Sequence, residues 1–180
     1  MADQYEKPYL ESSCFIAWIK DEVIENRSFV DEKVTVKGKE VTQKREVIEK
    51  IERGKITAHI LRLAEEGEFP IYTSALTLAE VHKKRKGQIL PDDLDERILA
   101  YFEHEYIKII DVDRRISEEA NEFCRKFGLL GNDAIHLACA LRAGCDVLLT
   151  WDDDFNAITH SQIRIEQPQI IGQTKMGFRP

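Results

Sequence analysis

The sequence predicts an α/β protein built around a mostly parallel sheet with helices on both faces. Short apolar strands alternate along the chain with amphipathic helices, which is the pattern typical of such sheets. No segment repeats, and 180 residues suffice for about one domain of roughly 150 residues. A hydrophobic fraction of 43% beside a charged fraction of 33% indicates a globular chain rather than a disordered one.

Five segments are expected to be strands and five more to be helices. The predicted strands cover residues 8–11, 70–74, 107–111, 147–150 and 163–165. The predicted helices cover residues 13–25, 76–86, 94–104, 117–127 and 132–143. Gly128 and Gly144 stand where helices would end, because glycine accepts the left-handed backbone of a helix C-terminus.

Two segments depart from this alternation. Residues 26–43 are strongly charged and are either a small two-stranded excursion that turns at Gly38 or a mobile loop. The apolar spacing within residues 45–66 predicts a helix that bends near Gly54. We therefore expect a single domain over residues 8–167 with a charged excursion at about 26–43, followed by a C-terminal tail over 168–180.

Composition disfavours several classes of protein. No run of about 18 uncharged apolar residues exists, so no membrane association is expected, and the charges in MADQYEKPYL disfavour a signal peptide. Four cysteines without zinc-type or C-x-x-C spacing predict buried, reduced thiols and a cytoplasmic protein. A net charge of −7 leaves two kinds of binding open, a local basic patch for nucleic acid or clustered carboxylates for a hard cation.

Four carboxylates follow predicted strands or stand early in predicted helices. Glu11 follows the first strand, Glu80 lies in the apolar helix SALTLAEV, Asp133 opens GNDAIHLACAL, and Asp152 follows the strand VLLT. Because the carboxyl ends of parallel strands meet at one edge, we expect these side chains to lie close together. Their mutual repulsion would be relieved by a divalent cation, and oxygen ligands favour Mg²⁺ or Mn²⁺. Such ions activate water and hold phosphodiester oxygens.

Each carboxylate also has an ordinary structural interpretation. Asp133 is suited to capping a helix, and Asp152 is suited to a turn. Glu80 can pair with a lysine one turn further along its helix, and Glu11 can lie on the surface at a strand end. Each signal alone is weak, and the four together favour a site.

The segments SALTLAEV, GLLGNDAIHLACAL and LLTWDDDF, in this order after YLESSCFI, resemble the PIN domain family. The resemblance covers residues 8–167, is strongest over 129–155, and is nearest to the VapC-like toxin ribonucleases. It implies a three-layer α/β/α sandwich with a central sheet of four to five strands. It further implies a metal-dependent endoribonuclease for single-stranded RNA that pairs as a homodimer and is inhibited by a small antitoxin protein.

The same resemblance implies roles for the acidic residues. Glu11, Glu80, Asp133 and Asp152 match the four acidic positions of the family. In this interpretation Glu11, Asp133 and Asp152 bind Mg²⁺ or Mn²⁺ directly, and Glu80 is a further ligand or a base that orients water.

Three further features accompany this assignment. Asp154 is expected to be an auxiliary metal ligand, because in an extended segment it shares a side with Asp152. Ser13 matches a small polar residue that supports the first acid. The family ordinarily has Asp where this chain has Glu11, which leaves open an alternative function, a catalytically impaired PIN-like module that binds RNA or a protein partner.

Other motifs are less specific. The basic run Lys83, Lys84, Arg85 and Lys86 either binds RNA phosphates beside the metal site or is a solvated helix end. His136 is expected to be a buried, hydrogen-bonded histidine rather than a catalytic one. No H-E-x-x-H, G-x-S-x-G or P-loop spacing is present, so zinc hydrolysis, serine hydrolysis and nucleotide triphosphate binding are disfavoured.

Overall fold

The main sheet consists of five parallel strands in the order β5-β4-β1-β6-β7. The structure, a computed structural model, describes residues 5–36, 39–81, 94–156, 158 and 162–171. The strands are β1 (Pro8–Leu10), β4 (Ile71–Ser74), β5 (Ile107–Ile110), β6 (Val147–Leu149) and β7 (Arg164–Glu166). Each bound lies within about one residue of its predicted position. The predicted parallel α/β fold is confirmed.

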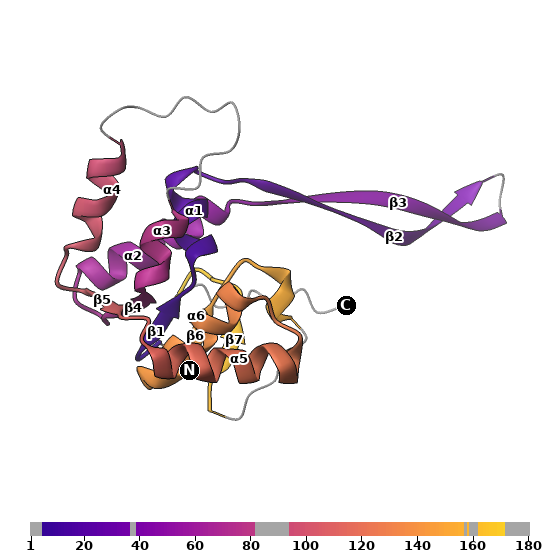
Figure 1. Cartoon of the computed structure of the whole chain (residues 1–180). Helices are drawn as coiled ribbons and strands as arrows, with labels where there is room; N and C mark the ends of the chain where they lie inside the picture. The colour runs from indigo at the N-terminus through magenta and orange to yellow at the C-terminus, as the bar shows by residue number, and fades with distance from the viewer. Residues whose placement is uncertain (1–4, 37–38, 82–93, 157, 159–161, 172–180) are drawn as a thin grey trace.

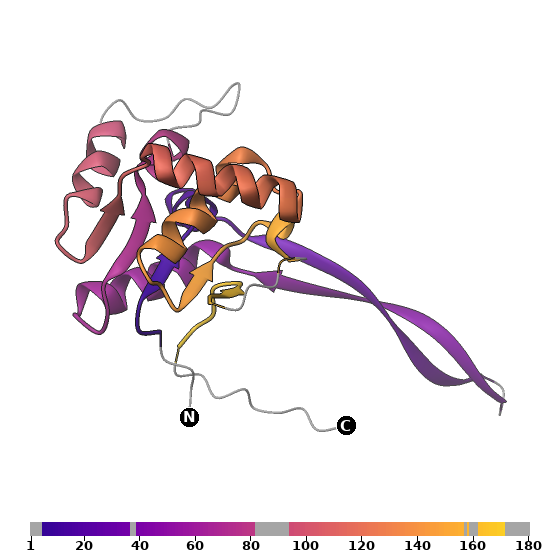
Figure 2. The same ribbon diagram turned by 60° about the horizontal axis from the view of Figure 1, so that its bottom comes forward.

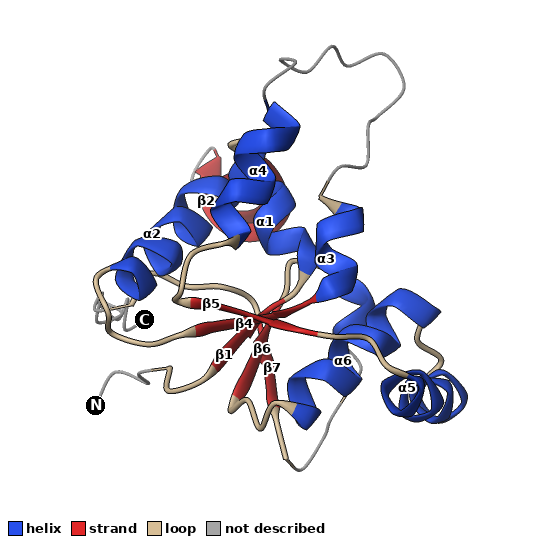
Figure 3. Ribbon diagram, turned by 60° about the vertical axis from the view of Figure 1, so that its left-hand side comes forward, coloured by secondary structure: helices blue, strands red, loops and turns tan. Residues whose placement is uncertain are grey.

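Helices cover both faces of this sheet, giving three layers (Figure 3). The helices are α1 (Ser12–Ile19), α2 (Arg53–Glu65), α3 (Ala75–Glu80), α4 (Leu94–Phe102), α5 (Arg114–Phe127) and α6 (Gly131–Arg142). Side chains alternate along β1, so Leu10 packs into the core with α1, α2 and α4, while Tyr9 packs into the core with α5 and α6. Both residues are fully buried. The predicted α/β/α sandwich is confirmed.

Three helix boundaries differ from the prediction by three residues or more. α3 ends at Glu80 rather than at residue 86, and residues 82–86 of that predicted helix lie outside the described part of the chain. α1 ends at Ile19 rather than at residue 25, because Asp21 adopts a left-handed backbone (φ 46°) and Ile24 begins a strand. α5 begins three residues earlier than predicted, at Arg114, because Asp113 caps it by accepting a hydrogen bond from the Ile116 amide at 2.9 Å. The predicted helix stops are confirmed, since Gly128 and Gly144 have φ of 74° and 66°.

A long antiparallel hairpin projects from the sandwich (Figures 1 and 2). It consists of β2 (Ile24–Val36) and β3 (Lys39–Ile51), which form a sheet of their own. Of the two interpretations of residues 26–43, the two-stranded one is confirmed, with longer strands than predicted, and the turn predicted at Gly38 lies outside the described residues. The helix predicted over 45–66 is wrong for residues 45–51, which pair with residues 24–30. Cross-strand pairing overrides a weak helical spacing there, in a segment whose Val47 and Ile48 are suited to strands.

Gly54 does not bend a helix, as predicted, but lets two helices approach. A Cβ atom at this position would lie 2.8 Å from the Asp21 Cα atom and 2.9 Å from the Ala17 carbonyl oxygen. Any side chain would therefore push the start of α2 away from the end of α1. This contact fixes the position of the neighbouring Arg53.

The cysteines are free thiols at four separate places. Cys14, Cys139 and Cys145 are buried as predicted, whereas Cys124 is half-buried. Burial raises the pKa of Cys139 and Cys145 to about 12, so both keep their protons at neutral pH. In the part of the chain that the structure describes, every helix is too short or too polar to cross a lipid bilayer.

Candidate functional site

Carboxylates from four segments of the chain line one pocket of about 370 Å³ at the carboxyl edge of the sheet. Its acidic lining residues are Glu11, Glu80, Asp133, Asp152 and Asp154. β1 lies between β4 and β6, so the strand order reverses beside it, which is where parallel sheets form a crevice. The expected convergence of the acidic residues is therefore observed.

Glu11 is fixed by three hydrogen-bond donors. It caps α1, and its Oε2 atom accepts from the Ser13 amide at 2.9 Å and from the Thr150 hydroxyl at 3.0 Å. The Ser12 hydroxyl donates to its Oε1 atom. Only 4% of Glu11 is exposed, so its orientation in the pocket is set by the protein.

Two hydroxyl groups join the start of α1 to the end of β6. The Ser13 Oγ atom accepts a hydrogen bond from the Trp151 amide at 2.9 Å, and the Thr150 Oγ1 atom accepts one from the Asp152 amide at 2.9 Å. Thr150 thus holds Glu11 and Asp152 together. The sequence interpretation missed Thr150, which it placed as the last residue of the strand predicted over 147–150, two residues before Asp152.

Asp152 and Asp154 lie in a tight turn rather than an extended segment. Residues Asp153–Phe155 form a short 3-10 helix, and the Asp152 Oδ1 atom accepts from the Asp154 amide at 2.9 Å. The extended geometry predicted for this segment is wrong, because Asp152 caps the turn. Asp154 nevertheless lines the same pocket as Asp152.

Glu80 is held by α6 through both of its carboxylate oxygens. Its Oε1 atom accepts from the Asn132 side-chain amide at 2.6 Å, and its Oε2 atom lies 2.9 Å from the His136 Nε2 atom. Burial acts to raise the pKa of Glu80, but hydrogen bonds led by that from His136 outweigh it and leave the pKa below its ordinary value. Asn132 was missed by the sequence interpretation, although it directly precedes Asp133.

His136 is fully buried and hydrogen-bonded, as predicted, but it also reaches the site. Its Nδ1 atom lies 2.8 Å from the Tyr9 hydroxyl, and its Nε2 atom lies 3.7 Å from the Glu11 Oε1 atom. Glu11, Glu80 and His136 each bring a ligand atom within 4.8 Å of the others, a spacing that a metal ion could bridge. The sequence interpretation missed this link to the two glutamates.

Asp133 experiences the accumulated negative charge most strongly. Burial and the nearby carboxylates of Asp152, Glu11 and Asp154 raise its pKa to about 6. Among the described residues that line the pocket there is no lysine or arginine. The pocket therefore has the electrostatic character of a cation site, and oxygen donors of this kind fit a hard divalent ion.

The pocket brings together all six acidic and hydroxyl residues that the sequence singled out. These are Glu11, Ser13, Glu80, Asp133, Asp152 and Asp154. Their individual roles in metal binding and catalysis stay predictions. The basic run Lys83, Lys84, Arg85 and Lys86 lies outside the described residues. Its first two lysines are the ones considered above as partners of Glu80.

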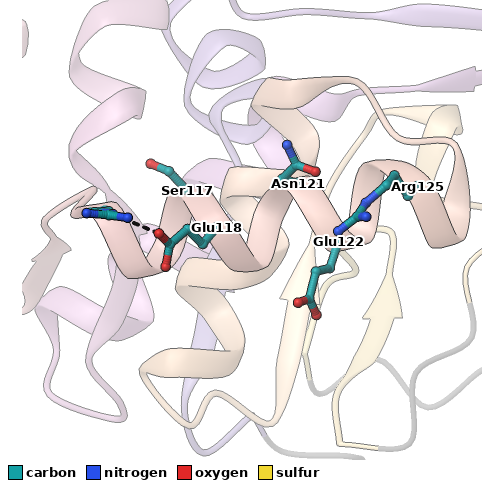
Figure 4. A pocket seen from close by; sticks show the side chains of 6 residues that line it. Ser117, Glu118, Asn121, Glu122 and Arg125 are labelled. Carbon is teal, nitrogen blue, oxygen red and sulfur yellow. Dashed lines mark hydrogen bonds and ion pairs between the residues drawn. The ribbon is translucent and has the colours of Figure 1, made fainter.

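A second concavity, of about 530 Å³, lies along the exposed face of α5 (Figure 4). All of its lining residues come from that one helix, and Arg114 and Glu118 pair with each other at 2.7 Å. Side chains that project from one face of a single helix do not converge on a ligand. The acidic pocket is the stronger candidate for chemistry.

A match to a known family agrees with this fold. Residues 46–160 match the family model described as PIN domain. A toxin–antitoxin complex from Klebsiella pneumoniae is similar in structure at 22% identity and a TM-score of 0.45, over 64% of this chain and 93% of that chain. VapBC2 from Rickettsia felis, bound to a DNA fragment from their promoter, is similar at 17% identity and a TM-score of 0.49, over 89% and 98%. No curated protein matches the chain.

Proposed function

The chain belongs to the PIN domain family, whose members are generally nucleases, and from this premise we propose that it is an endoribonuclease that uses Mg²⁺ or Mn²⁺ to cleave single-stranded RNA. One observation carries the proposal: the carboxylates of Glu11, Glu80, Asp133 and Asp152 converge on one pocket at the carboxyl edge of the sheet. Such a cluster is destabilising on its own and becomes stabilising around a divalent cation.

Asp133, Asp152 and Glu11 are the residues that would hold the ion, with Asp154 at the rim. The raised pKa of Asp133 supports this assignment, because a nearby cation would counter both causes of the increase, the burial of the carboxylate and its repulsion by neighbouring carboxylates. When bound, the ion supplies an activated water and stabilises charge on the phosphate oxygens. Three donors hold Glu11 in one orientation, so its carboxylate is presented to the pocket without the ordering that a free side chain would need.

Glu80 is placed either to orient a water molecule or to be a further ligand of the ion. Both of its oxygens already accept hydrogen bonds, from Asn132 and His136. A carboxylate has about four acceptor sites, so each oxygen retains one for the hydrogen of a water molecule. The lowered pKa of Glu80 keeps it ionised at neutral pH, as this role requires.

The proposal is tested by removing one carboxylate charge at a time. Asp133→Asn and Asp152→Asn should each reduce the cleavage rate of a labelled single-stranded RNA by at least about a hundredfold, as expected for loss of a group that stabilises transition-state charge. Asp113→Asn is a matched control, because the asparagine still caps α5 and lies outside the pocket. Full cleavage by either pocket variant would contradict the assignment.

We further propose that this ribonuclease is the toxin of a toxin–antitoxin pair and acts as a cytoplasmic homodimer. The support is the resemblance of GLLGNDAIHLACAL and LLTWDDDF to the VapC-like branch. Expression of the chain alone should arrest growth, and co-expression of a small protein encoded beside it should relieve the arrest. Abundant soluble protein without any effect on growth would count against the toxin role.

The second candidate is a catalytically impaired module that binds RNA or a protein partner. Glu11 favours it, because its carboxylate extends one methylene beyond the aspartate of the family and already accepts three protein hydrogen bonds. Mg²⁺ requires near-ideal octahedral geometry, which a displaced ligand disturbs. The two candidates differ in whether the wild-type protein turns over RNA.

A further inference from the structure

Another pocket, of about 340 Å³ and distinct from the concavity on α5, adjoins the acidic pocket at the base of the hairpin. The two pockets share Ser13, Ile16 and Asp152 in their linings. The remaining walls of the pocket at the hairpin base are Glu22, Arg53, Trp151 and Asp153. A molecule that fills the acidic pocket can therefore continue past Asp152 into this one.

Arg53 stands in this pocket with unsatisfied hydrogen-bond donors. Only 18% of its side chain is exposed, and its Nε atom is buried without a hydrogen-bond partner. Its Nη1 atom lies 3.6 Å from the Glu22 Oε2 atom, which is an ion pair but beyond hydrogen-bonding distance. Among the described residues the guanidinium has no hydrogen-bond acceptor, although buried polar groups almost always have one.

The surrounding structure holds the guanidinium in place. It lies over the Trp151 ring, 5.1 Å from the ring centroid, and the Trp151 Nε1 atom donates to the Thr57 hydroxyl at 3.2 Å. The backbone of Arg53 is fixed because the next residue, Gly54, packs against Asp21 and Ala17. A rigid, partly buried arginine with free donors is suited to an anion that offers two oxygens in a plane.

We propose that this pocket binds a backbone phosphate of the RNA strand, adjacent to the phosphate at the acidic pocket, and that Arg53 is its ligand. The inference deepens the proposed function, on which its choice of RNA rests. Asp152 faces both pockets, and a cation in the acidic pocket would counter its charge. Asp153 also lines this pocket and is exposed to solvent, and Glu22 is the carboxylate that forms an ion pair with Arg53, at 3.6 Å.

The test is binding of a fluorescein-labelled single-stranded RNA of twelve nucleotides, followed by anisotropy from low to high salt. All proteins carry Asp133→Asn, which stops cleavage under the proposed function and lies outside the Arg53 pocket. Arg53→Gln should weaken binding about tenfold at low salt and reduce the slope of log K against log salt by about 0.7, the loss of one phosphate contact. Arg53→Lys keeps the positive charge but lacks the planar set of N–H donors of a guanidinium, and its affinity for RNA should lie between those of the parent and Arg53→Gln.

Two further variants separate phosphate binding from general electrostatics and from a structural role. Lys55→Gln removes a positive charge from the same turn of α2, at an exposed residue paired with Glu52, and should bind like the parent. Glu22→Gln removes the competitor of the phosphate and should tighten binding, whereas an arginine that serves only to pair with Glu22 would give no gain. Circular dichroism melts verify folding.

The proposal is overturned if Arg53→Gln and Lys55→Gln bind alike, if the parent binds no RNA at low salt, or if Glu22→Gln fails to tighten binding. The last comparison remains decisive even where Arg53→Gln does not fold. Arg53-dependent binding by a wild-type protein that never cleaves RNA would refute the proposed function alone. If cleavage is lost in Asp133→Asn but Arg53→Gln leaves both RNA binding and cleavage unchanged, this inference alone is refuted.

Discussion

The Nε2 atom of His136 lies 2.9 Å from the Oε2 atom of Glu80, while Nδ1 on the same ring lies 2.8 Å from the Tyr9 hydroxyl. The ionised Glu80 carboxylate can only accept, so Nε2 carries the ring hydrogen and donates to it. Nδ1 then accepts from the Tyr9 hydroxyl, whose pKa burial raises well above its usual range. This buried chain of hydrogen bonds connects the central strand to the acidic pocket.

Replacing His136 should therefore affect stability more than replacing an exposed histidine. His136→Ala removes a hydrogen-bond partner from the Tyr9 hydroxyl and from the Glu80 Oε2 atom and opens a cavity, so the free energy of unfolding should fall by about 2–4 kcal/mol. Urea denaturation followed by circular dichroism measures it. The control His104→Ala, at an exposed position, should change it by less than about 1 kcal/mol. Equal losses in the two variants would mean that the chain of hydrogen bonds contributes nothing.

The raised pKa of Asp133 predicts a pH dependence in metal-free protein. Its folded-state pKa is about 6, above its value in the unfolded chain, so the folded state binds more protons between about pH 4 and 6. The contribution of Asp133 to stability is therefore most favourable at low pH and is lost as the pH rises through 6. Thermal melts of wild type and Asp133→Asn in EDTA, at pH 4.5 and 7.5, isolate this contribution.

The expected result is that Asp133→Asn stabilises the protein at pH 7.5 and loses that advantage at pH 4.5, where Asp133 is neutral in the folded state. Glu80 opposes this trend because its pKa is lowered, but it is present in both proteins and cancels in their difference. A difference in melting temperature between the two proteins that is the same at both pH values would show that the pKa of Asp133 is not raised in the folded state.

Shortening Glu11 to the aspartate of the family should not improve the protein. Glu11→Asp draws the carboxylate back by one methylene from the Thr150 hydroxyl and the Ser13 amide. We expect a lower melting temperature and no gain in the RNA cleavage rate, because the site is built around the longer side chain. Melting and single-turnover cleavage with Mn²⁺ measure both effects. A large gain in turnover would identify the wild-type site as impaired and favour the second candidate function.

The hairpin should be dispensable for folding. Its strands pair with each other in a separate sheet, and Phe29 and Val30 are 67% and 53% exposed. Glu25 and Lys50 are direct partners, so residues 26–49 can be replaced by Asn-Gly, which closes a two-residue turn. The shortened chain should melt within a few degrees of the full one. Failure of the shortened chain to fold would show that the hairpin stabilises the sandwich.

The fold could be predicted because its signals are local. Four of the five strands of the main sheet are short, largely apolar runs next to a helix in the chain, and Gly128 ends α5 in the backbone conformation that glycine favours. The hairpin was harder to predict, since residues 45–51 become a strand only through pairing with residues 24–30. Such pairing is a property of two distant segments together and leaves little periodicity in either.

The site could be predicted in part for a related reason. Glu11 and Asp152 follow strands, so the convergence of parallel strands placed them without knowledge of any contact. Thr150 donates to Glu11 and Asn132 donates to Glu80, and hydrogen-bond partners across 139 and 52 residues of sequence have no local signal. Arg53 was missed because its role depends on Trp151 and Glu22, which only the folded chain brings to it.

The most direct test of the central claim is cleavage of a labelled single-stranded RNA by the purified protein, with Mn²⁺, with Mg²⁺ and with EDTA, beside Asp152→Asn prepared identically. The asparagine can still accept the hydrogen bond from the Asp154 amide, so the turn is preserved while one charge is removed. We predict cleavage that requires a divalent ion and disappears in Asp152→Asn. Cleavage that persists in EDTA, or that is as fast in Asp152→Asn as in the wild type, would contradict the assignment of the acidic pocket as the nuclease centre.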